Sequence, residues 1–306
     1  MATIYAQAYF GDKITPLEHA QLSVASSAVL YGLSVYTVFP VHIDSAGRRQ
    51  AFRLDDHFER LINSARIIGI DTFEPKWSKE AFMAATTELL DANAVERDVF
   101  IRATVHVDEL VAGTRSRGLS TVLSMFVYDA VPILPAEGAR LKTSVWRRIP
   151  DYAIPSRAKV NGAYVNSVLA KQDALDSGYD DCVFLDAAGH VCELSAANIF
   201  MVRGGKLITP STTSDLLEGI NRRTVIEVAQ DLGIPVVERD IDLTELYIAD
   251  EVFASGTSAY LSSVKEIDAR KVGGGDVGLL TRQIQKLYRQ ILFGESKQYK
   301  HLTTQL

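Results

Sequence analysis

The sequence has very little cysteine. Cys182 and Cys192 are the only two in 306 residues, and no other cysteine or histidine stands at zinc-finger spacing around them. A framework of several disulfides is therefore excluded, and we expect two reduced thiols. The chain also lacks an apolar run of about 18 residues, which a membrane-spanning helix needs, and a basic start followed by an apolar stretch, which marks a secretory signal. We expect a cytoplasmic protein with no membrane partner.

The sequence also has no excess of basic residues. Lysine and arginine number 32 against 38 aspartates and glutamates, so the net charge is −6. A general nucleic-acid binder is disfavoured, although a local anion site needs only a few donors. The phosphate-binding GxxxxGK[ST] loop, the GxSxG elbow and the zinc-binding HExxH pair are missing, and we expect no metal. The remaining composition, 47% hydrophobic and 23% charged, is typical of a folded globular protein.

The length favours two domains of moderate size. Residues 128–138 read YDAVPILPAEG, which contains two prolines and no periodic pattern, and such a stretch indicates a linker. We therefore predict a small N-terminal domain over residues 1–127 and a large domain over residues 139–306, both of mixed α and β structure.

Hydrophobic periodicity predicts the elements that carry the candidate site. Apolar residues recur at helical spacing from Phe58 to Ile68 and stop before Gly69, which indicates a helix. Residues 100–107 alternate, which indicates a half-buried strand with Phe100 and Arg102 on its more polar face. Further helices are expected at residues 163–178, 220–232 and 279–292, and further strands at 121–127, 142–148, 182–185, 191–194, 198–202, 206–208 and 251–254.

Two short segments could present backbone N–H groups to an anion. Gly219 stands directly before a predicted helix, in the segment 217–221, and the free amides and dipole of a helix N-terminus favour a phosphate. The segment 255–259, SGTSA, follows a predicted strand and could form a second amide cup. Each segment alone is more typical of an ordinary capped helix or tight turn.

Four side chains have both a chemical and a plain structural interpretation. Lys159 precedes a helix and could be a solvated lysine. Glu193 lies in an apolar strand, where a carboxylate needs a buried partner or a function unless that face is exposed. Tyr164 could belong to the core, and Arg60 lies off the apolar stripe of its helix.

Together these residues resemble the class IV aminotransferases, which are pyridoxal-phosphate (PLP) enzymes of fold type IV. The similarity implies an α+β fold like that of D-amino acid aminotransferase, with a smaller N-terminal α/β domain and a larger C-terminal domain that contains a barrel-like sheet. Its order and spacing are specific to the family. The similar segments cover nearly the whole chain: 29–36, 52–68, 100–102, 154–166, 191–200, 216–223 and 250–259.

The resemblance implies roles for individual residues. Lys159 matches the Schiff-base lysine that also moves the proton of the substrate, Glu193 the acid facing the pyridine nitrogen, and Tyr164 the hydroxyl beside the ring oxygen O3′. The implied phosphate cup and supporting cofactor contacts are Arg60, Asn198, Leu217, Ile220, Asn221 and Thr257. The implied substrate contacts are Tyr31, Tyr36, Phe100, Arg102, Thr257, Ser258 and Ala259.

Within the family the chain is most similar to branched-chain amino acid aminotransferases. Arg102 matches an arginine that holds the second carboxylate of glutamate, so the first prediction is transfer from a branched-chain L-amino acid to 2-oxoglutarate. Residues 35–40 read VYTVFP where that group has VFEGIR, and Phe100 stands where a tyrosine is usual. These departures leave open a D-amino acid or (R)-amine transaminase, and a lyase resembling aminodeoxychorismate lyase. Arg115 or Arg117 could also contact a substrate carboxylate, and the resemblance implies at least a homodimer.

Overall fold

The computed structural model describes residues 2–306, which form two compact units. Unit 1 comprises Met1–Val131, Ala158–Gly162 and Ile291–Leu306, and unit 2 comprises Pro132–Arg157 and Ala163–Gln290. The first division between them falls inside the predicted linker, residues 128–138. Residues 158–162 and 291–306 associate with unit 1, whereas the sequence placed them in the large domain. Each unit is therefore discontinuous in sequence.

Unit 1 is built on a seven-stranded sheet whose order is β16-β4-β3-β5-β6-β1-β2. Its neighbouring strands all run antiparallel. The elements of this unit are β1 (Ile4–Phe10), β2 (Lys13–Pro16), α1 (Ser27–Tyr31), β3 (Ser34–Ile43), β4 (Arg49–Phe52), α2 (Leu54–Ile67), α3 (Lys79–Ala92), β5 (Val99–Val107), β6 (Thr121–Asp129) and β16 (Thr303–Gln305), with short 3-10 turns at Leu17–His19, Glu74–Lys76 and Lys300–Leu302.

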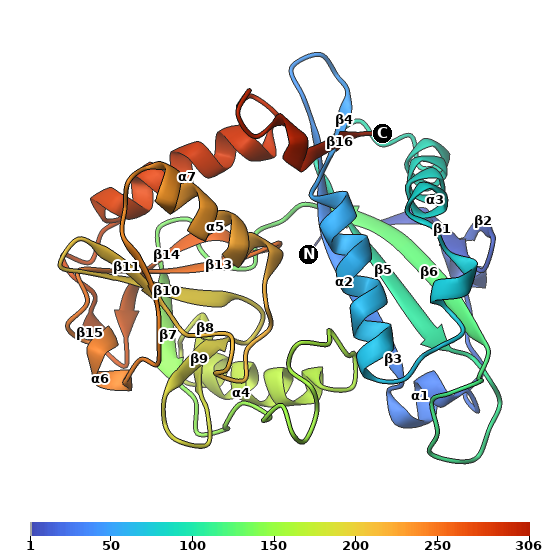
Figure 1. Ribbon diagram of the computed structural model, residues 1–306, viewed down its shortest axis with the longest axis horizontal. Coiled ribbons are helices and arrows are strands. Elements are labelled where there is room, and N and C mark those ends of the chain that lie inside the picture. Colours follow the sequence, from blue (N-terminus) through green and yellow to red (C-terminus); the bar gives the residue numbers. More distant parts are fainter. Residues whose placement is uncertain (1) are drawn as a thin grey trace. The chain divides into compact units, whose positions relative to one another are not determined.

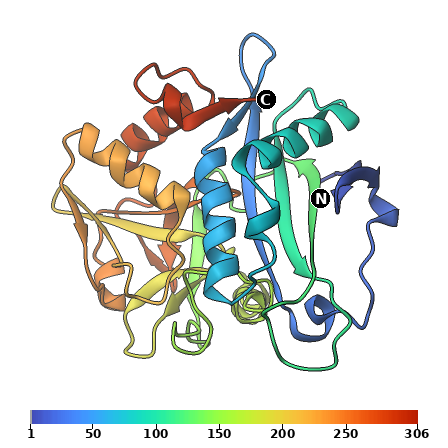
Figure 2. The same cartoon turned by 45° about the vertical axis from the view of Figure 1, so that its right-hand side comes forward.

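Helices α2 and α3 cover one face of this sheet, as Figures 1 and 2 show, with α2 on β3 and α3 on β1 and β6. The apolar stripe of α2 is buried, and each buried leucine or isoleucine contributes roughly 1.5–3 kcal/mol. The helix ends where predicted, because Gly69 adopts a left-handed conformation (φ 77°). The N–H groups of Gly69 and Ile70 then bond to the carbonyls of Arg66 and Ala65, which is a Schellman motif.

Unit 2 contains the barrel-like sheet that was expected. Strands β10-β13-β14-β7-β8-β9 are hydrogen-bonded in that order, and β9 pairs again with β10, so six strands close a mixed ring. The elements are β7 (Ala139–Thr143), α4 (Tyr164–Asp176), β8 (Asp181–Leu185), β9 (Val191–Leu194), β10 (Asn198–Arg203), β11 (Lys206–Thr209), α5 (Ile220–Asp231), β12 (Val236–Glu238), α6 (Leu243–Leu246), β13 (Glu251–Gly256), β14 (Tyr260–Ile267), β15 (Arg270–Lys271) and α7 (Leu279–Leu292).

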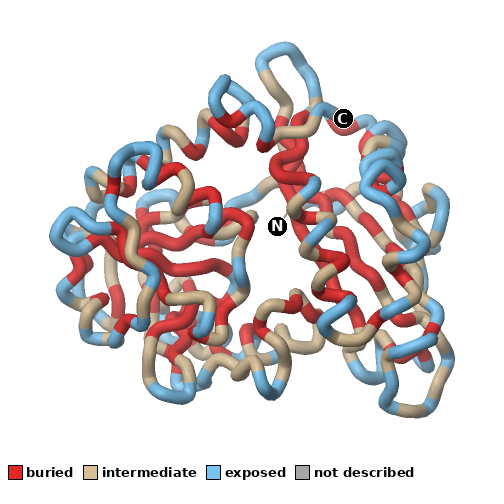
Figure 3. The backbone as a smooth tube through the Cα atoms, in the orientation of Figure 1, coloured by how far each residue is buried: buried red, intermediate tan, exposed pale blue. Residues whose placement is uncertain are grey.

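The strands of this ring form the buried centre of unit 2, which is red in Figure 3. Helix α5 packs on β13, and α4 packs on β8 and β7. The strand predicted at residues 142–148 is misplaced: β7 runs from Ala139 to Thr143, so the prediction missed its first residues, and residues 144–148 are not a strand. Only Ser144 and Arg148 there donate backbone hydrogen bonds to β8, while Val145 and Trp146 are exposed.

The two cysteines are reduced, as expected. Cys182 and Cys192 are free thiols, both buried, and burial raises the pKa of each. Throughout residues 2–306, no helix combines the length and the apolar character that crossing a membrane requires.

Candidate active site

The segment that carries Lys159 pairs with the sheet of unit 1. Val160 forms an antiparallel bridge with Val35 of β3, and the carbonyl of Lys159 accepts a hydrogen bond from the N–H of Tyr36 at 3.0 Å. On the other side of the segment, the N–H of Lys159 donates to Oγ of Ser64 in α2 at 3.1 Å. Both sides of the lysine backbone are thus fixed within one unit.

The aromatic ring of Tyr36 contacts two basic side chains. The guanidinium carbon of Arg102 lies 3.6 Å from the ring centroid, and Nζ of Lys159 lies 4.9 Å from it. Tyr36 is on β3 and Arg102 on the adjacent β5, where Val38 is the direct partner of Arg102. Arg102 also donates through Nη2 to Oδ1 of Asn161. The structure therefore brings the predicted residues Tyr36, Arg102 and Lys159 together.

Arg60 belongs to a polar group between helix α2 and strand β3. Its Nη2 donates to Oγ1 of Thr37 at 3.1 Å, and Oγ1 of Thr37 is 2.8 Å from Nδ1 of His57. Both Thr37 and His57 are completely buried. Thr37, one of the residues that departs from the branched-chain pattern, thus helps to orient the arginine of the implied phosphate cup.

The other predicted substrate contacts of unit 1 differ from one another in how far they are exposed. Tyr31 is the last residue of α1 and is half exposed, whereas Phe100 is fully buried with its ring 5.6 Å from that of Tyr128. Arg115 and Arg117 are exposed on a loop.

In unit 2, Glu193 is buried and surrounded by donors. Its Oε1 forms an ion pair with Nε of Arg148 at 2.9 Å, and both side chains are largely buried, at 7% and 12% exposure. Its Oε2 accepts hydrogen bonds from Nδ2 of Asn198 at 3.2 Å and from the N–H of Leu217 at 3.3 Å. A carboxylate held by a cation and two neutral donors retains its charge in a buried place. The sequence indicated that Glu193 needs a buried partner, but it did not identify Arg148.

Three loops of unit 2 meet around Asn198. Its Nδ2 also donates to the carbonyl of Leu217 at 2.9 Å, and Asn198 is the β-sheet partner of Ser255. Gly219 lies so close that a Cβ atom there would be 2.1 Å from Oδ1 of Asn198. Gly256 is confined less tightly, because a Cβ atom there would lie 3.2 Å from the carbonyl of Ala196 and from Cβ of Ala197. The two weak anion-binding segments of the sequence, 217–221 and 255–259, therefore belong to one group of loops.

Helix α5 begins at this group of loops. Its N-cap is Gly219, which has no side chain to bond the first amides, so the N–H groups of Ile220 and Asn221 remain available to an anion. Within residues 2–306, Oδ1 of Asn221 is one of the buried polar atoms that have no hydrogen-bond partner. Thr257, Ser258 and Ala259 form the turn between β13 and β14, and half-buried Tyr164 begins α4.

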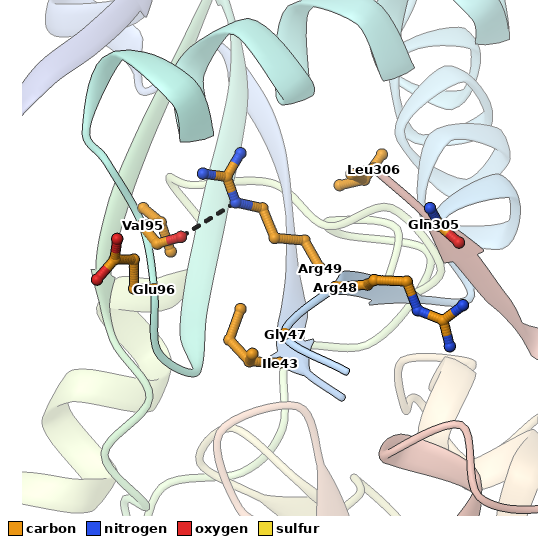
Figure 4. Close-up of a pocket in the computed structure, with 8 residues that line it drawn as sticks. All are labelled: Ile43, Gly47, Arg48, Arg49, Val95, Glu96, Gln305 and Leu306. Atoms are coloured by element: carbon orange, nitrogen blue, oxygen red, sulfur yellow. Dashed lines mark hydrogen bonds between the residues drawn. The ribbon is translucent and has the colours of Figure 1, made fainter. Parts of the chain in front are cut away.

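A cavity of about 530 Å³ in unit 1 is lined by none of the predicted site residues (Figure 4). It is lined by parts of the β3–β4 hairpin, the loop before β5 and the last residues of the chain. Its two arginines are already engaged: Arg48 pairs with Asp44, and Arg49 pairs with Asp91 and bonds to the carbonyl of Val95. The cavity thus contains no candidate catalytic group of the kind found around Lys159 and Glu193.

Comparison with a family model shows to which protein family the chain belongs. The model for amino-transferase class IV matches residues 34–267. The chain belongs to the class IV aminotransferases. This aminotransferase is 38% identical over 301 residues to a probable branched-chain-amino-acid aminotransferase of Aquifex aeolicus, covering 97% of this chain and 96% of the relative. It is 33% identical over 294 residues to the branched-chain-amino-acid aminotransferase of Escherichia coli, covering 94% of each.

Solved structures agree with this aminotransferase assignment. The branched-chain aminotransferase of Thermoproteus uzoniensis with norvaline matches with a TM-score of 0.94 and 35% identity, over 98% of this chain and 99% of that one. The branched-chain amino acid aminotransferase of Thermobaculum terrenum in its PLP form matches with a TM-score of 0.91 and 32% identity, over 99% of this chain and 98% of that one. The predicted enzyme class and the predicted fold class are confirmed.

Proposed function

We propose that this aminotransferase uses PLP to transfer the amino group of a branched-chain L-amino acid to 2-oxoglutarate. The observation that carries the proposal is the similarity over nearly the whole chain to branched-chain enzymes, at up to 38% identity among those named above. The same relatives give no support to the alternative of a D-amino acid or (R)-amine substrate, which depended on residues 36–40. The relatives named above are all aminotransferases, so they give no support to the lyase alternative either.

The polar groups of the chain fit PLP. An anionic phosphate matches the open N-terminus of α5 and its first residues, Ile220 and Asn221, with Arg60 and Thr257 as further donors. Because Gly219 has no Cβ atom, the backbone at the start of α5 can lie against the side chain of Asn198. When bound, PLP supplies a pyridinium ring that accepts the electrons released when the substrate Cα loses its proton.

Each polar residue near the cofactor has a distinct role in this proposal. Lys159 holds the cofactor covalently, and its freed Nζ carries the proton to and from the substrate Cα. Glu193 faces the pyridine nitrogen and keeps it protonated, because Arg148 stabilises the negative charge of the carboxylate. Asn198 and Leu217 orient Glu193, and Tyr164 donates to the ring oxygen O3′.

The substrate contacts must accept both an apolar side chain and a carboxylate. Tyr31 and the small exposed part of Tyr36 offer aromatic surface to a branched aliphatic side chain, whereas Phe100 is fully buried and can only support that surface from behind. Arg102 offers the planar donors that bind the second carboxylate of glutamate or 2-oxoglutarate. The turn Thr257, Ser258 and Ala259 offers backbone amides to the α-carboxylate.

The decisive experiment compares amino donors directly. The purified holoenzyme is mixed with L-leucine, L-isoleucine, D-alanine or an (R)-amine, and the change in cofactor absorption and the glutamate formed from 2-oxoglutarate are measured. We expect conversion with the two branched-chain L-amino acids. Conversion only with D-alanine or the (R)-amine would refute the proposed substrate. Lys159→Ala should abolish turnover, whereas Lys206→Ala, at an exposed position of β11, should not.

We also propose that the protein forms a homodimer through an apolar surface of unit 2. Val165, Val168 and Leu169 of α4 are exposed at 65%, 64% and 41%. The adjoining residues Val145 and Trp146 are exposed too, and Asn166 ties their loop to α4 by hydrogen bonds. Exposed apolar patches of this kind mark interaction surfaces. Val168→Glu should convert the dimer to a monomer in light scattering, and an unchanged mass would contradict this interface.

A further inference from the structure

Asn161, two residues after Lys159, is held rigidly against strand β3. Its N–H donates to the carbonyl of Ser34 at 3.0 Å, and its Nδ2 contacts Oγ of the same serine at 2.7 Å. Ser34 is itself buried. With both backbone and amide anchored to one buried residue, the remaining atom Oδ1 has a fixed direction.

That oxygen atom is directed at Arg102, from which it accepts a hydrogen bond through Nη2. The orientation of the amide follows from chemistry, because a guanidinium only donates and must face the oxygen rather than the NH₂ group. The face of the same guanidinium lies on the ring of Tyr36 at 3.6 Å. Arg102 is thus fixed along one edge by Asn161 and on one face by Tyr36.

Arg102 lies close enough to Lys159 for one dicarboxylic substrate to reach both. Nζ of Lys159 and the guanidinium carbon lie 4.9 Å and 3.6 Å from the centroid of one ring. Their separation cannot exceed the sum of these distances, which the side chain of glutamate and its hydrogen bonds can span. An arginine held in place binds a carboxylate without first losing rotamer freedom.

We propose that Asn161 is the positioning residue that orients Arg102 for the second carboxylate of the dicarboxylic substrate. This inference rests on the proposed function, because it assumes that Arg102 receives that carboxylate. An aliphatic side chain makes no hydrogen bond to Arg102, so the contribution of Asn161 is selective. It strengthens glutamate and 2-oxoglutarate binding and leaves branched-chain substrates nearly unaffected.

The test compares two acids of similar size on the holoenzyme by isothermal titration calorimetry. Glutarate carries the second carboxylate, and 4-methylvaleric acid carries a branched aliphatic end. We expect Asn161→Ala to raise the Kd of glutarate about tenfold, equal to about 1.4 kcal/mol, and to change that of 4-methylvaleric acid less than about twofold. In steady-state kinetics, KM for glutamate should rise while kcat and the constants for leucine stay near the wild-type values.

Two further variants distinguish a positioning role of Asn161 from a general loss of stability or folding. Asn161→Asp keeps an oxygen acceptor beside Arg102 but adds a negative charge, so glutarate should bind more weakly than to Asn161→Ala. Asn63→Ala removes another asparagine whose Oδ1 accepts from an arginine, Arg66, and should leave both acids unaffected.

The inference on Asn161 would be overturned if Asn161→Ala weakened the binding of both acids equally, left the Kd of glutarate unchanged, or bound glutarate more tightly. None of these outcomes would contradict the proposed function. A wild-type holoenzyme that binds neither acid and transaminates neither leucine nor glutamate would overturn the proposed function, and this inference with it.

Discussion

Replacing Arg148 by methionine should destabilise unit 2 by about 3 kcal/mol. Methionine keeps most of the side-chain volume but leaves Glu193 without the cation that lies 2.9 Å away in a largely buried pair. Breaking one partner of a buried ion pair costs about 3–5 kcal/mol, because the remaining charge is uncompensated. The two neutral donors to Glu193, from Asn198 and Leu217, remain, so we expect the lower end of this range.

Urea unfolding of unit 2 can be followed by one tryptophan. The chain has two, Trp77 in unit 1 and Trp146 in unit 2, so a Trp77→Phe background leaves fluorescence from unit 2 alone. The background also carries Val168→Glu, so that dissociation of the proposed dimer at Trp146 does not contribute to the signal. The matched control is Arg147→Met, which removes the same charge from the exposed neighbouring residue and should change the free energy of unfolding by less than about 0.5 kcal/mol. Equal losses in the two variants would refute the assignment of a buried pair, and so would no loss in Arg148→Met.

Two further predictions concern Gly219 and His106. Gly219→Ala should lower the free energy of unfolding of unit 2 by about 2 kcal/mol in the same urea assay, because the new Cβ displaces Asn198. The control Gly274→Ala places its Cβ in open space and should cost less than about 0.5 kcal/mol. Equal costs in the two variants would contradict the close contact at Gly219. Burial, with the nearby positive charge of Arg102, lowers the pKa of His106 from 6.5 to about 4. The unfolded chain therefore binds this proton first as the pH falls, and stability should decrease by up to about 3 kcal/mol between about pH 6.5 and pH 4. His106→Asn should remove that part of the pH dependence measured by urea unfolding, and an identical slope in both proteins would contradict it.

Local patterns were sufficient to predict about half of the elements of the fold, and they did not predict strand β3 or helix α3. The alternation of residues 100–107 corresponds to β5, and the apolar stripe that stops before Gly69 corresponds to α2. The prediction that β5 is half-buried was wrong, because every residue of the strand is buried except Arg102 and His106, which are partly buried. Residues 144–148 were misassigned to a strand because their composition is β-like, while their exposure depends on which part of the chain pairs with β8. The closed ring of unit 2 came from the family resemblance, since no local pattern predicts that β9 pairs with β10.

The candidate site was predictable only where a polar residue stands in an otherwise apolar segment of the sequence. Glu193 attracted attention as a carboxylate in an apolar strand, and it is indeed buried. Its partner Arg148 and the amide of Asn161 could not be recognised, because each is an ordinary polar residue until the fold brings it to Glu193 or Arg102. These contacts join residues far apart in the chain, and periodicity reports only on neighbours.

Helix α4 illustrates a further limit of periodicity. Its spacing of Val165, Val168 and Leu169 correctly indicated a helix, yet these residues are exposed. The residues that α4 buries are small, Ala170 and Ala174 among them. An apolar stripe therefore identifies a helix without identifying what covers it.

The composition of unit 1 has a consequence for biosynthesis. Its edge strand β16, Thr303–Gln305, pairs with β4 and comes from the last residues of the chain, after the whole of unit 2 has been translated. Domains usually fold in the order in which they are synthesised. Here the unit that begins first cannot be completed until residues 303–305 have been synthesised, and β4 lacks the pairing with β16 until then. A nascent chain stalled before residue 303 would thus expose an unpaired sheet edge, which is a target for chaperones and for aggregation.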